Sequence, residues 1–271
     1  MSAADVVSAV QRFSRVVGTR LDGAPCVVML DVDGTLAPIA PTPEQAAVPA
    51  ETKATLARLV ALRDVVLAFV SGRSALDAWH MTAVEGAWVI GNHGFEWRTP
   101  DGEVSPNDHA RRFEPAIMRA AQELDAALSG IAGVIVENKR WTLSVHYRLV
   151  DAARVPAIEE RCREAAQRLG LRVTEGKKIV ELRPPLDVNK GTAAVSFVAR
   201  VTARARRAAV LYIGDDRTDE DAFEALRRHH PSAVTVHVAA SETATTHAEI
   251  VVASTSEVRA VLDWLVERRG R

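Results

Sequence analysis

The chain has 271 residues, of which 48% are hydrophobic and 25% charged, as in an ordinary soluble globular protein. Its 34 basic and 35 acidic residues give a formal net charge of −1, so bulk charge provides no attraction toward nucleic acid or a membrane surface. No apolar run is long enough to span a membrane, and two cysteines argue against a disulfide scaffold and suit a reducing cytosol. We therefore expect a soluble, cytoplasmic protein.

The first predicted elements are an amphipathic helix over Met1–Gly18 and a buried strand over Cys26–Leu30. Asp31 and Asp33 follow this strand directly, and the chain then turns at Gly34. Carboxylates two residues apart point the same way, at the strand end where parallel sheets keep their ligand sites. One can attack as a nucleophile while the other moves protons, and both can hold a hard cation. The alternative is a surface turn, in which Asp and Gly are common.

A second buried strand is predicted at the apolar run Val65–Val70, after a helical pattern that follows Pro49. This run ends in Ser71-Gly72-Arg73, a turn whose hydroxyl and backbone N–H groups can bind an anion. Taken singly, such a turn is more often only a turn. Another strand fits Ala87–Ile90. Apolar strands that alternate with helices indicate a parallel α/β sheet.

The middle of the chain has a different pattern, because Glu114–Arg183 is predicted as helix, strand, strand, helix, strand, strand. Residues Trp141–Leu149 alternate between apolar and polar, which is typical of an antiparallel strand with one open polar face. The stretches Arg98–Asp108 and Arg183–Asp187 contain Pro and resemble crossings between two modules. The sequence therefore predicts a core over residues 1–108 and 184–271 and an inserted α/β module over residues 109–183.

Further polar groups begin the C-terminal part. Lys190 opens a predicted helix, Thr192–Val201, and a cation at a helix N-terminus suggests a nearby anion, although an isolated lysine more often faces solvent. The apolar run Ala209–Ile213 leads to Asp215-Asp216, and a cation is the simplest partner for so dense an acidic cluster. The acids Asp219–Asp221 alone would also fit a helix N-terminus. The last predicted elements are strands over Ala233–Val238 and Glu249–Ala253 and a helix over Glu257–Arg268.

These pieces, taken in order, resemble the haloacid dehalogenase superfamily of phosphotransferases. Its pattern is Asp-x-Asp-Gly-Thr, then Ser or Thr after a second strand, then a Lys before a helix, then paired acids after another strand. The matching residues here are Asp31–Thr35, Ser71, Lys190 and Asp215-Asp216. The resemblance implies a Rossmann-like parallel-sheet core, and the insertion is similar to the superfamily's larger α/β cap of antiparallel sheet and two helices.

Finer motifs are similar to those of the trehalose-6-phosphate phosphatases and extend over about Val27–Leu265. The most specific of them is Gly214–Phe223. No catalytic position departs from the family pattern, and the N-terminal helix has no counterpart in it. The other matching motifs are Asp31–Ile39, Val70–Arg73, Gly91–Gly94, Glu137–Lys139, His146–Arg148 and Glu181–Pro184.

The resemblance implies a role for each residue of the core. Asp31 would attack phosphorus and form an aspartyl-phosphate, and Asp33 would act as the acid and then the base. Ser71 and Lys190 would bind the phosphoryl oxygens as negative charge builds up. The implied metal is Mg²⁺, and its partners would be Asp31, the backbone carbonyl of Asp33, and Asp215, with Asp216 and Asp219 in outer or water-mediated positions.

Strand alternation indicates which residues of the cap share a sheet face. Glu137 and Lys139 share one face of their strand, and Glu181 and Arg183 share one face of theirs. Such groups can hydrogen-bond sugar hydroxyls, and the alternative is a row of cross-strand ion pairs on a solvated face. Histidines in these motifs are, singly, more often structural. The substrate-binding residues that the resemblance implies are Asn92, His93, Gly94, Glu137, Lys139, His146, Glu181 and Arg183.

The implied activity is hydrolysis of trehalose 6-phosphate to trehalose and phosphate, the last step of trehalose biosynthesis. We expect a monomer whose partner is a small sugar phosphate and which binds neither nucleic acid nor membrane. A phosphatase for another sugar phosphate or for a glycosyl phosphoglycerate is the alternative. A catalytically silent regulatory domain on this fold should have lost Asp31, Asp33, Lys190 or Asp215, and all are present. A phosphate-accepting receiver domain would be much shorter and lack the cap.

Overall fold

The computed structural model describes residues 3–42, 45–176, 178–239 and 245–270. The chain forms two compact units, Met1–Val104 with Val188–Arg271, which we call the core unit, and Ser105–Asp187, which we call the inserted unit. The N-terminal helix α1 covers Ala3–Val17, and the first two residues of its predicted range lie outside the described residues. Among the described helices, none has both the length and the apolar character needed to cross a membrane.

The core unit is built on a sheet with the strand order β12-β11-β10-β1-β2-β3-β4-β5, whose last strand, β5, ends two residues beyond Val104. Neighbouring strands from β12 through β3 are parallel, as predicted, whereas β4 runs antiparallel to β3. Strand β4 was not predicted, because three residues after a tight turn carry no periodic signal. The strands are β1 Cys26–Leu30, β2 Val65–Val70, β3 Trp88–Gly91, β4 Glu96–Arg98, β5 Val104–Pro106, β10 Ala209–Gly214, β11 Val234–Val238 and β12 Ile250–Val252.

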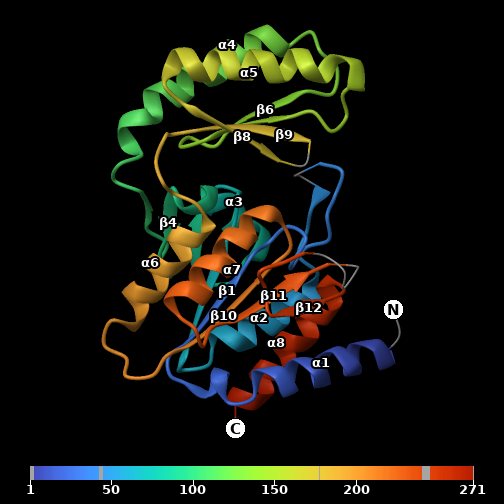
Figure 1. Cartoon of the computed structure of the whole chain (residues 1–271), viewed down its shortest axis with the longest axis vertical. Coiled ribbons are helices and arrows are strands. Elements are labelled where there is room, and N and C mark those ends of the chain that lie inside the picture. Colours follow the sequence, from blue (N-terminus) through green and yellow to red (C-terminus); the bar gives the residue numbers. More distant parts are fainter. Residues whose placement is uncertain (1–2, 43–44, 177, 240–244, 271) are drawn as a thin grey trace. The chain divides into compact units, whose positions relative to one another are not determined.

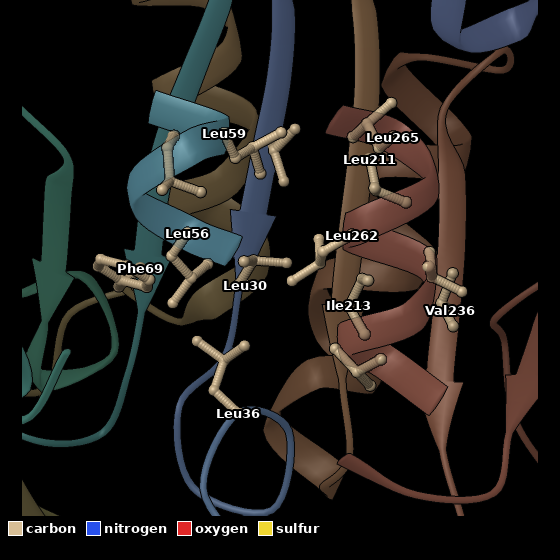
Figure 2. Close-up of a cluster of buried hydrophobic side chains, with 14 of the residues drawn as sticks. Leu30, Leu36, Leu56, Leu59, Phe69, Leu211, Ile213, Val236, Leu262 and Leu265 are labelled. Carbon is tan, nitrogen blue, oxygen red and sulfur yellow. The ribbon is translucent and has the colours of Figure 1, made fainter. Parts of the chain in front are cut away.

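Helices cover both faces of the core sheet (Figure 1). On one face, Leu30 of β1 packs in a cluster with Leu56 and Leu262 (Figure 2). On the other face, Met29 belongs to a second cluster with Phe197. Burial on both faces explains why these strands are uninterrupted apolar runs. The core helices are α1, α2 Ala50–Val60, α3 Ala75–Thr82, α6 Lys190–Thr202, α7 Arg217–His229 and α8 Thr255–Arg269.

The parallel strands place their carboxyl ends at one edge of the core sheet. Asp31 follows β1, Ser71 follows β2, Asn92 follows β3, and Asp215 follows β10. Because β1 lies between β10 and β2, the first two carboxylates of the sequence motif stand at the centre of this edge. Ligand sites of open α/β sheets form at such strand ends.

The inserted unit has the predicted succession of helix, strand, strand, helix, strand, strand. Its four strands pair antiparallel in the order β6-β7-β9-β8. Buried side chains of the two helices pack with Leu143, Val145 and Leu182, so alternate positions such as Ser144 lie on the opposite sheet face. The elements are α4 Glu114–Leu128, β6 Ile135–Asn138, β7 Leu143–His146, α5 Val155–Leu169, β8 Arg172–Gly176 and β9 Ile179–Arg183.

The predicted strand Trp141–Leu149 is too long, since β7 covers only Leu143–His146. A turn precedes it, in which the Trp141 N–H bonds to the Lys139 carbonyl oxygen. Another turn follows it, in which the Val150 N–H bonds to Tyr147. Trp141 and Tyr147 are buried although they lie in turns, so the alternation of apolar residues continued past the strand. The two cysteines, Cys26 and Cys162, are free thiols, one in each unit.

Candidate active site

A buried ion network lies at the carboxyl edge of the core sheet. The Lys190 Nζ donates hydrogen bonds to Oδ1 of Asp31 at 2.7 Å and to Oδ1 of Asp219 at 2.8 Å. Lys190 is the first residue of α6, whose start is fixed by a capping box between Asn189 and Thr192. Burial favours the neutral amine, but the carboxylates of Asp219 and Asp31 raise the pKa of Lys190 well above its ordinary value. The negative charge that the sequence predicted near Lys190 is therefore supplied by two aspartates, Asp31 and Asp219.

Asp219 organises the end of strand β10. Tyr212 also donates its hydroxyl hydrogen to Oδ1 at 2.8 Å, and the N–H groups of Asp215 and Asp216 donate to Oδ2 at 3.0 and 3.1 Å. Burial raises the pKa of Asp219 to about 6, against the opposing effect of Lys190. The sequence interpretation missed Tyr212, although it is the only polar side chain in its apolar run and a buried hydroxyl needs a partner.

Three carboxylates at this edge could hold a metal ion. One oxygen each from Asp31, Asp215 and Asp219 lies within 4.8 Å of the other two. Oδ1 of Asp215 is buried and has no hydrogen-bond partner among the described residues. Burial, followed by the negative charges of Asp219 and Asp216, raises the pKa of Asp215 to about 7. An all-oxygen donor set with an unsatisfied buried oxygen fits a hard divalent cation such as Mg²⁺.

The turn after β1 leaves room for this carboxylate cluster. Gly34 has a φ of +83°, and a Cβ there would lie 2.1 Å from Oδ2 of Asp215. Burial also raises the pKa of Asp31 well above its ordinary value, although Lys190 lowers it. A bound cation would favour the ionised form of Asp31 and Asp215, which is the form in which a carboxylate binds a metal ion.

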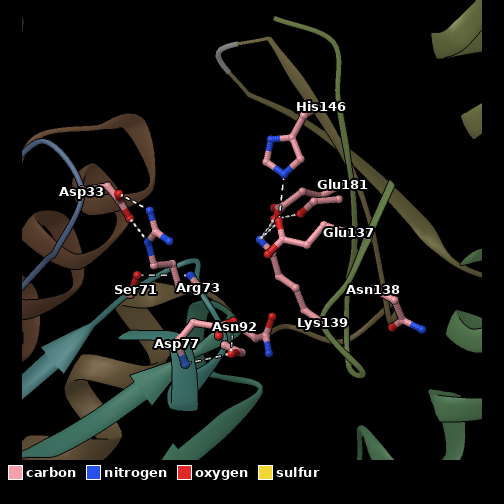
Figure 3. A network of polar contacts seen from close by, with 12 residues as sticks. Asp33, Ser71, Arg73, Asp77, Asn92, Glu137, Asn138, Lys139, His146 and Glu181 are labelled. Carbon is pink, nitrogen blue, oxygen red and sulfur yellow. Dashed lines mark hydrogen bonds and ion pairs between the residues drawn. The ribbon is translucent and has the colours of Figure 1, made fainter. Parts of the chain in front are cut away.

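Asp33 is held by a partner that the sequence interpretation missed. Arg73 donates from Nε to Oδ2 of Asp33 and from Nη2 to Oδ1, both at 2.7 Å (Figure 3). The Ser71 Oγ accepts a hydrogen bond from the backbone N–H of Arg73 at 3.1 Å. Arg73 is part of the quoted motif, and a guanidinium near a carboxylate strand end could have suggested this bidentate pair. The pair fixes the orientation of the Asp33 carboxylate.

The loop after β3 closes onto the loop after β2. Asn92 and His93 have left-handed φ values of 50° and 56°, and Gly94 follows at 109°. The N–H of His93 donates to the carbonyl oxygen of Ser71 at 2.9 Å. A Cβ on Gly72 would lie 2.6 Å from Nε2 of His93, so the imidazole ring rests against this glycine. The structure thus brings the predicted residues 92–94 beside Ser71.

Asp216 acts mainly as a helix cap. It is the N-cap of α7 and accepts hydrogen bonds from the N–H groups of Thr218 and Asp219. Its Oδ1 lies 4.0 Å from the Nζ of Lys190. Burial opposes its ionisation, but Lys190 and the hydrogen bond from Thr218 lower the pKa of Asp216 below its ordinary value. Its carboxylate is therefore already partnered within the cluster.

In the inserted unit, the predicted residues form one polar network on a sheet face. Nζ of Lys139 lies 3.4 Å from Oε1 of Glu181 and 3.7 Å from Oε2 of Glu137, and Nε2 of His146 lies 2.8 Å from that Glu137 oxygen (Figure 3). Ser144, which the sequence interpretation did not single out, donates to Oε1 of Glu181 at 3.0 Å. The Nε of Arg183 donates to Oε2 of Glu181 at 2.9 Å.

The α/β core with this polar edge and an antiparallel-sheet insertion has the haloacid dehalogenase fold. The sequence profile of the trehalose-phosphatase family matches residues 29–256. The chain therefore belongs to the trehalose-phosphatase family, which confirms the resemblance inferred from its motifs.

Individual relatives agree with this family. A trehalose-phosphate phosphatase of Mycobacterium avium (strain 104) is 41% identical over 209 residues, which are 76% of this chain and 53% of that protein. The chain thus spans about half the length of the curated relatives it matches. The crystal structure of a trehalose-6-phosphate phosphatase related protein has a TM-score of 0.76 at 30% identity, covering 89% of this chain and 97% of that chain. The structure of an Aspergillus fumigatus trehalose-6-phosphate phosphatase has a TM-score of 0.62 at 25% identity, and the match covers 94% of this chain and 97% of that chain.

Proposed function

We propose that this chain is a Mg²⁺-dependent phosphatase that hydrolyses trehalose 6-phosphate to trehalose and inorganic phosphate, the last step of trehalose biosynthesis. The observation that carries the proposal is the meeting of Asp31, Asp33, Ser71 and Lys190 at one sheet edge in a member of the trehalose-phosphatase family. The names of its relatives support the substrate. A cytoplasmic monomer stays our prediction.

In the first half of the reaction, a carboxylate oxygen of Asp31 attacks phosphorus and the bond from phosphorus to the sugar oxygen breaks. Asp33 gives its proton to that departing oxygen, and the product left on the enzyme is an aspartyl-phosphate. Ser71 and Lys190 bind the phosphoryl oxygens as their charge increases. Lys190 is suited to this role because the buried acids around it keep it protonated.

In the second half, Asp33 removes a proton from water, whose oxygen attacks phosphorus. The bond from phosphorus to Asp31 then breaks, which releases phosphate and restores the Asp31 carboxylate. Arg73 holds both Asp33 oxygens, so one of them must exchange its Arg73 hydrogen bond for the substrate or the water. We propose that Arg73 returns Asp33 to one orientation between the two proton transfers.

The proposed cation would be held by Asp31, the backbone carbonyl of Asp33, and Asp215. Asp216 and Asp219 would act from outer positions, since the oxygens of both are already engaged by Thr218, Lys190 and backbone N–H groups. When bound, Mg²⁺ would neutralise the charge on the transferring phosphoryl group.

We propose that the inserted unit provides substrate specificity. Its carboxylates Glu137 and Glu181, with Lys139, would hydrogen-bond the glucose unit farther from phosphorus. His146 and Arg183 would hold those carboxylates in place, since each contacts one of them. On the core unit, Asn92, His93 and Gly94 would contact the substrate from the loop beside Ser71. The two functional domains would be residues 1–108 with 184–271, and residues 109–183.

Phosphate release across a substrate panel tests the proposal. The panel contains trehalose 6-phosphate, glucose 6-phosphate, sucrose 6-phosphate and a glucosyl phosphoglycerate, each with Mg²⁺ and after chelation. We expect the highest kcat/KM for trehalose 6-phosphate and no turnover without a divalent cation. A higher kcat/KM for another ester would favour the alternative sugar phosphatase. Absence of turnover on every ester would favour the silent regulatory domain.

A further inference from the structure

Glu96 is a buried carboxylate that takes no part in the proposed reaction. It lies on β4, two residues after the left-handed loop, and its residue surface is 6% exposed. Its Oε1 accepts two hydrogen bonds, from the backbone N–H of Ala75 at 2.6 Å and from Nδ2 of Asn92 at 2.8 Å. A buried charged group requires such partners, because its desolvation would otherwise be costly.

The two donors belong to the two loops that carry site residues. Ala75 is the first residue of α3, directly after Ser71–Ser74, and its N–H is a donor that a helix leaves unsatisfied. A carboxylate at this helix N-terminus is favoured by the helix dipole. Asn92 opens the loop after β3. One oxygen atom of Glu96 therefore joins both loops.

The contact between these loops is close and strained. A Cβ on Gly91 would lie 2.3 Å from the backbone nitrogen of Ala75, so only glycine permits this approach. The N–H of Asn92 donates to the carbonyl oxygen of Arg73 at 2.7 Å, in parallel with the bond from His93 to Ser71. Asn92 and His93 hold left-handed conformations that non-glycine residues adopt only where their surroundings require it.

We propose that Glu96 is a positioning residue that locks the loop after β2 to the loop after β3. This lock sets where the Ser71 hydroxyl and the Arg73 guanidinium lie, and Arg73 in turn orients Asp33. The activity tests of this proposal rest on the proposed function, because they presuppose that the chain is a phosphatase. Because Ser71 acts on the phosphoryl group that all substrates share, losing the lock lowers kcat for every phosphate ester.

The main test compares Glu96→Met, which removes the acceptor at similar length, with Glu96→Gln, which keeps a carbonyl oxygen. Glu85→Gln is the matched control, since Glu85 is an exposed glutamate on the connection between α3 and β3. We expect Glu96→Met to lower kcat by about 10- to 100-fold on both trehalose 6-phosphate and nitrophenyl phosphate, as small displacements of reacting groups do. Glu96→Gln should lose roughly fivefold or less, because a neutral acceptor gives weaker hydrogen bonds. Glu85→Gln should match the wild type.

A double-mutant cycle with Ser71→Ala separates positioning from general destabilisation. If Glu96 acts through Ser71, the two losses in kcat are not additive, whereas a loss caused by partial unfolding adds to any other. Thermal unfolding of each variant sets an assay temperature at which it is folded. A folded Glu96→Met variant with kcat within twofold of wild type, or strictly additive losses, would overturn the proposal.

Amide hydrogen exchange tests the lock without using activity. In Glu96→Gln, and in Glu96→Met if it folds, the amides of Ala75, Asn92 and His93 should exchange faster while those of β1 stay protected. Unchanged exchange at these amides would overturn the proposal. If the wild type releases no phosphate from any ester, the proposed function fails, and hydrogen exchange still decides the role of Glu96.

Discussion

The carboxyl edge of the core sheet and the polar face of the inserted unit both bring acids and bases together, but by different routes. In the core, Lys190 bonds to Asp31, which is 159 positions away in sequence, and to Asp219, which is 29 away. In the inserted unit, the polar residues lie on paired strands whose register places Glu137 opposite Ser144 and Ser144 opposite Glu181. The core cluster forms because the ends of several strands and a helix meet. The cluster of the inserted unit forms because alternate residues of paired strands share one sheet face.

The two clusters also differ in charge balance. At the core edge, Lys190 lies among the carboxylates of Asp31, Asp215 and Asp219, and the pKa of Asp215 is raised to about 7 because burial and its acidic neighbours oppose its ionisation. On the inserted face, Lys139 and Arg183 match Glu137 and Glu181. An excess of carboxylates favours binding of a cation, which phosphoryl transfer uses. Equal numbers of acidic and basic side chains favour hydrogen bonds to uncharged hydroxyl groups.

The largest effect that this comparison predicts comes from Asp31→Asn. Asparagine fills the same space but cannot attack phosphorus, so turnover should fall by about 10⁴-fold or more while the fold is kept. Phosphate release and circular dichroism measure the two effects. The matched control is Asp125→Asn, an exposed aspartate of α4, which should retain full activity. Substantial metal-dependent turnover in pure Asp31→Asn protein would remove Asp31 from the nucleophile role.

Asp33→Asn should separate substrates by their leaving groups. We expect a loss of about 10²- to 10⁴-fold on trehalose 6-phosphate, whose sugar oxygen needs a proton to depart. The loss should be smaller on nitrophenyl phosphate, because nitrophenolate departs readily as an anion. Parallel kcat measurements on both esters, and trapping of the phospho-enzyme with the second, check this. Equal losses on the two substrates would count against Asp33 as the general acid.

Substitutions on the inserted face should show the opposite selectivity. Glu137→Ala, Lys139→Ala and Glu181→Ala should each lower kcat/KM for trehalose 6-phosphate by on the order of 10- to 100-fold, since a lost polar partner costs ~1–3 kcal/mol. Nitrophenyl phosphate has no second sugar and should be hydrolysed almost as before. Little effect on either ester would indicate a purely structural row of ion pairs. An equal loss on both would indicate a role in folding or in support of the reaction.

The smallest predicted effect is the change in folding stability with pH and with bound Mg²⁺. Because the pKa of Asp215 is raised to about 7 in the folded chain, the folded state keeps a proton that the unfolded state releases above pH ~4. The metal-free protein should therefore lose stability as pH rises from about 4 through 7.

Mg²⁺ binds the ionised carboxylates, so its stabilising effect should be larger at pH 8 than at pH 5.5. At 100-fold excess over Kd, it is worth ~2.7 kcal/mol, or roughly 5–10 °C in Tm. Thermal unfolding with and without Mg²⁺ at both pH values measures this, and Asp215→Asn should reduce the difference. A shift in Tm that is the same at both pH values would contradict the assignment.

Much of the fold could be predicted because its signals are local. The apolar runs at β1, β2 and β10 mark strands buried on both faces, and the polar residues after them mark one edge of a parallel sheet. The order of elements in the inserted unit followed from periodicity in the same way. The length of β7 could not be predicted, because buried turn residues such as Trp141 and Tyr147 continue the apolar alternation.

The sequence by itself determined which residue types stand at the strand ends, since strand periodicity and motif spacing depend only on residues close together in the chain. Only the tertiary structure decided their partners: Arg73 for Asp33, Tyr212 for Asp219, and Ala75 and Asn92 for Glu96. These partners lie on different elements, and each hydrogen bond requires a donor and an acceptor within about 3 Å and in line. Such distances are set when strands and helices pack, so no local pattern of residues contains them.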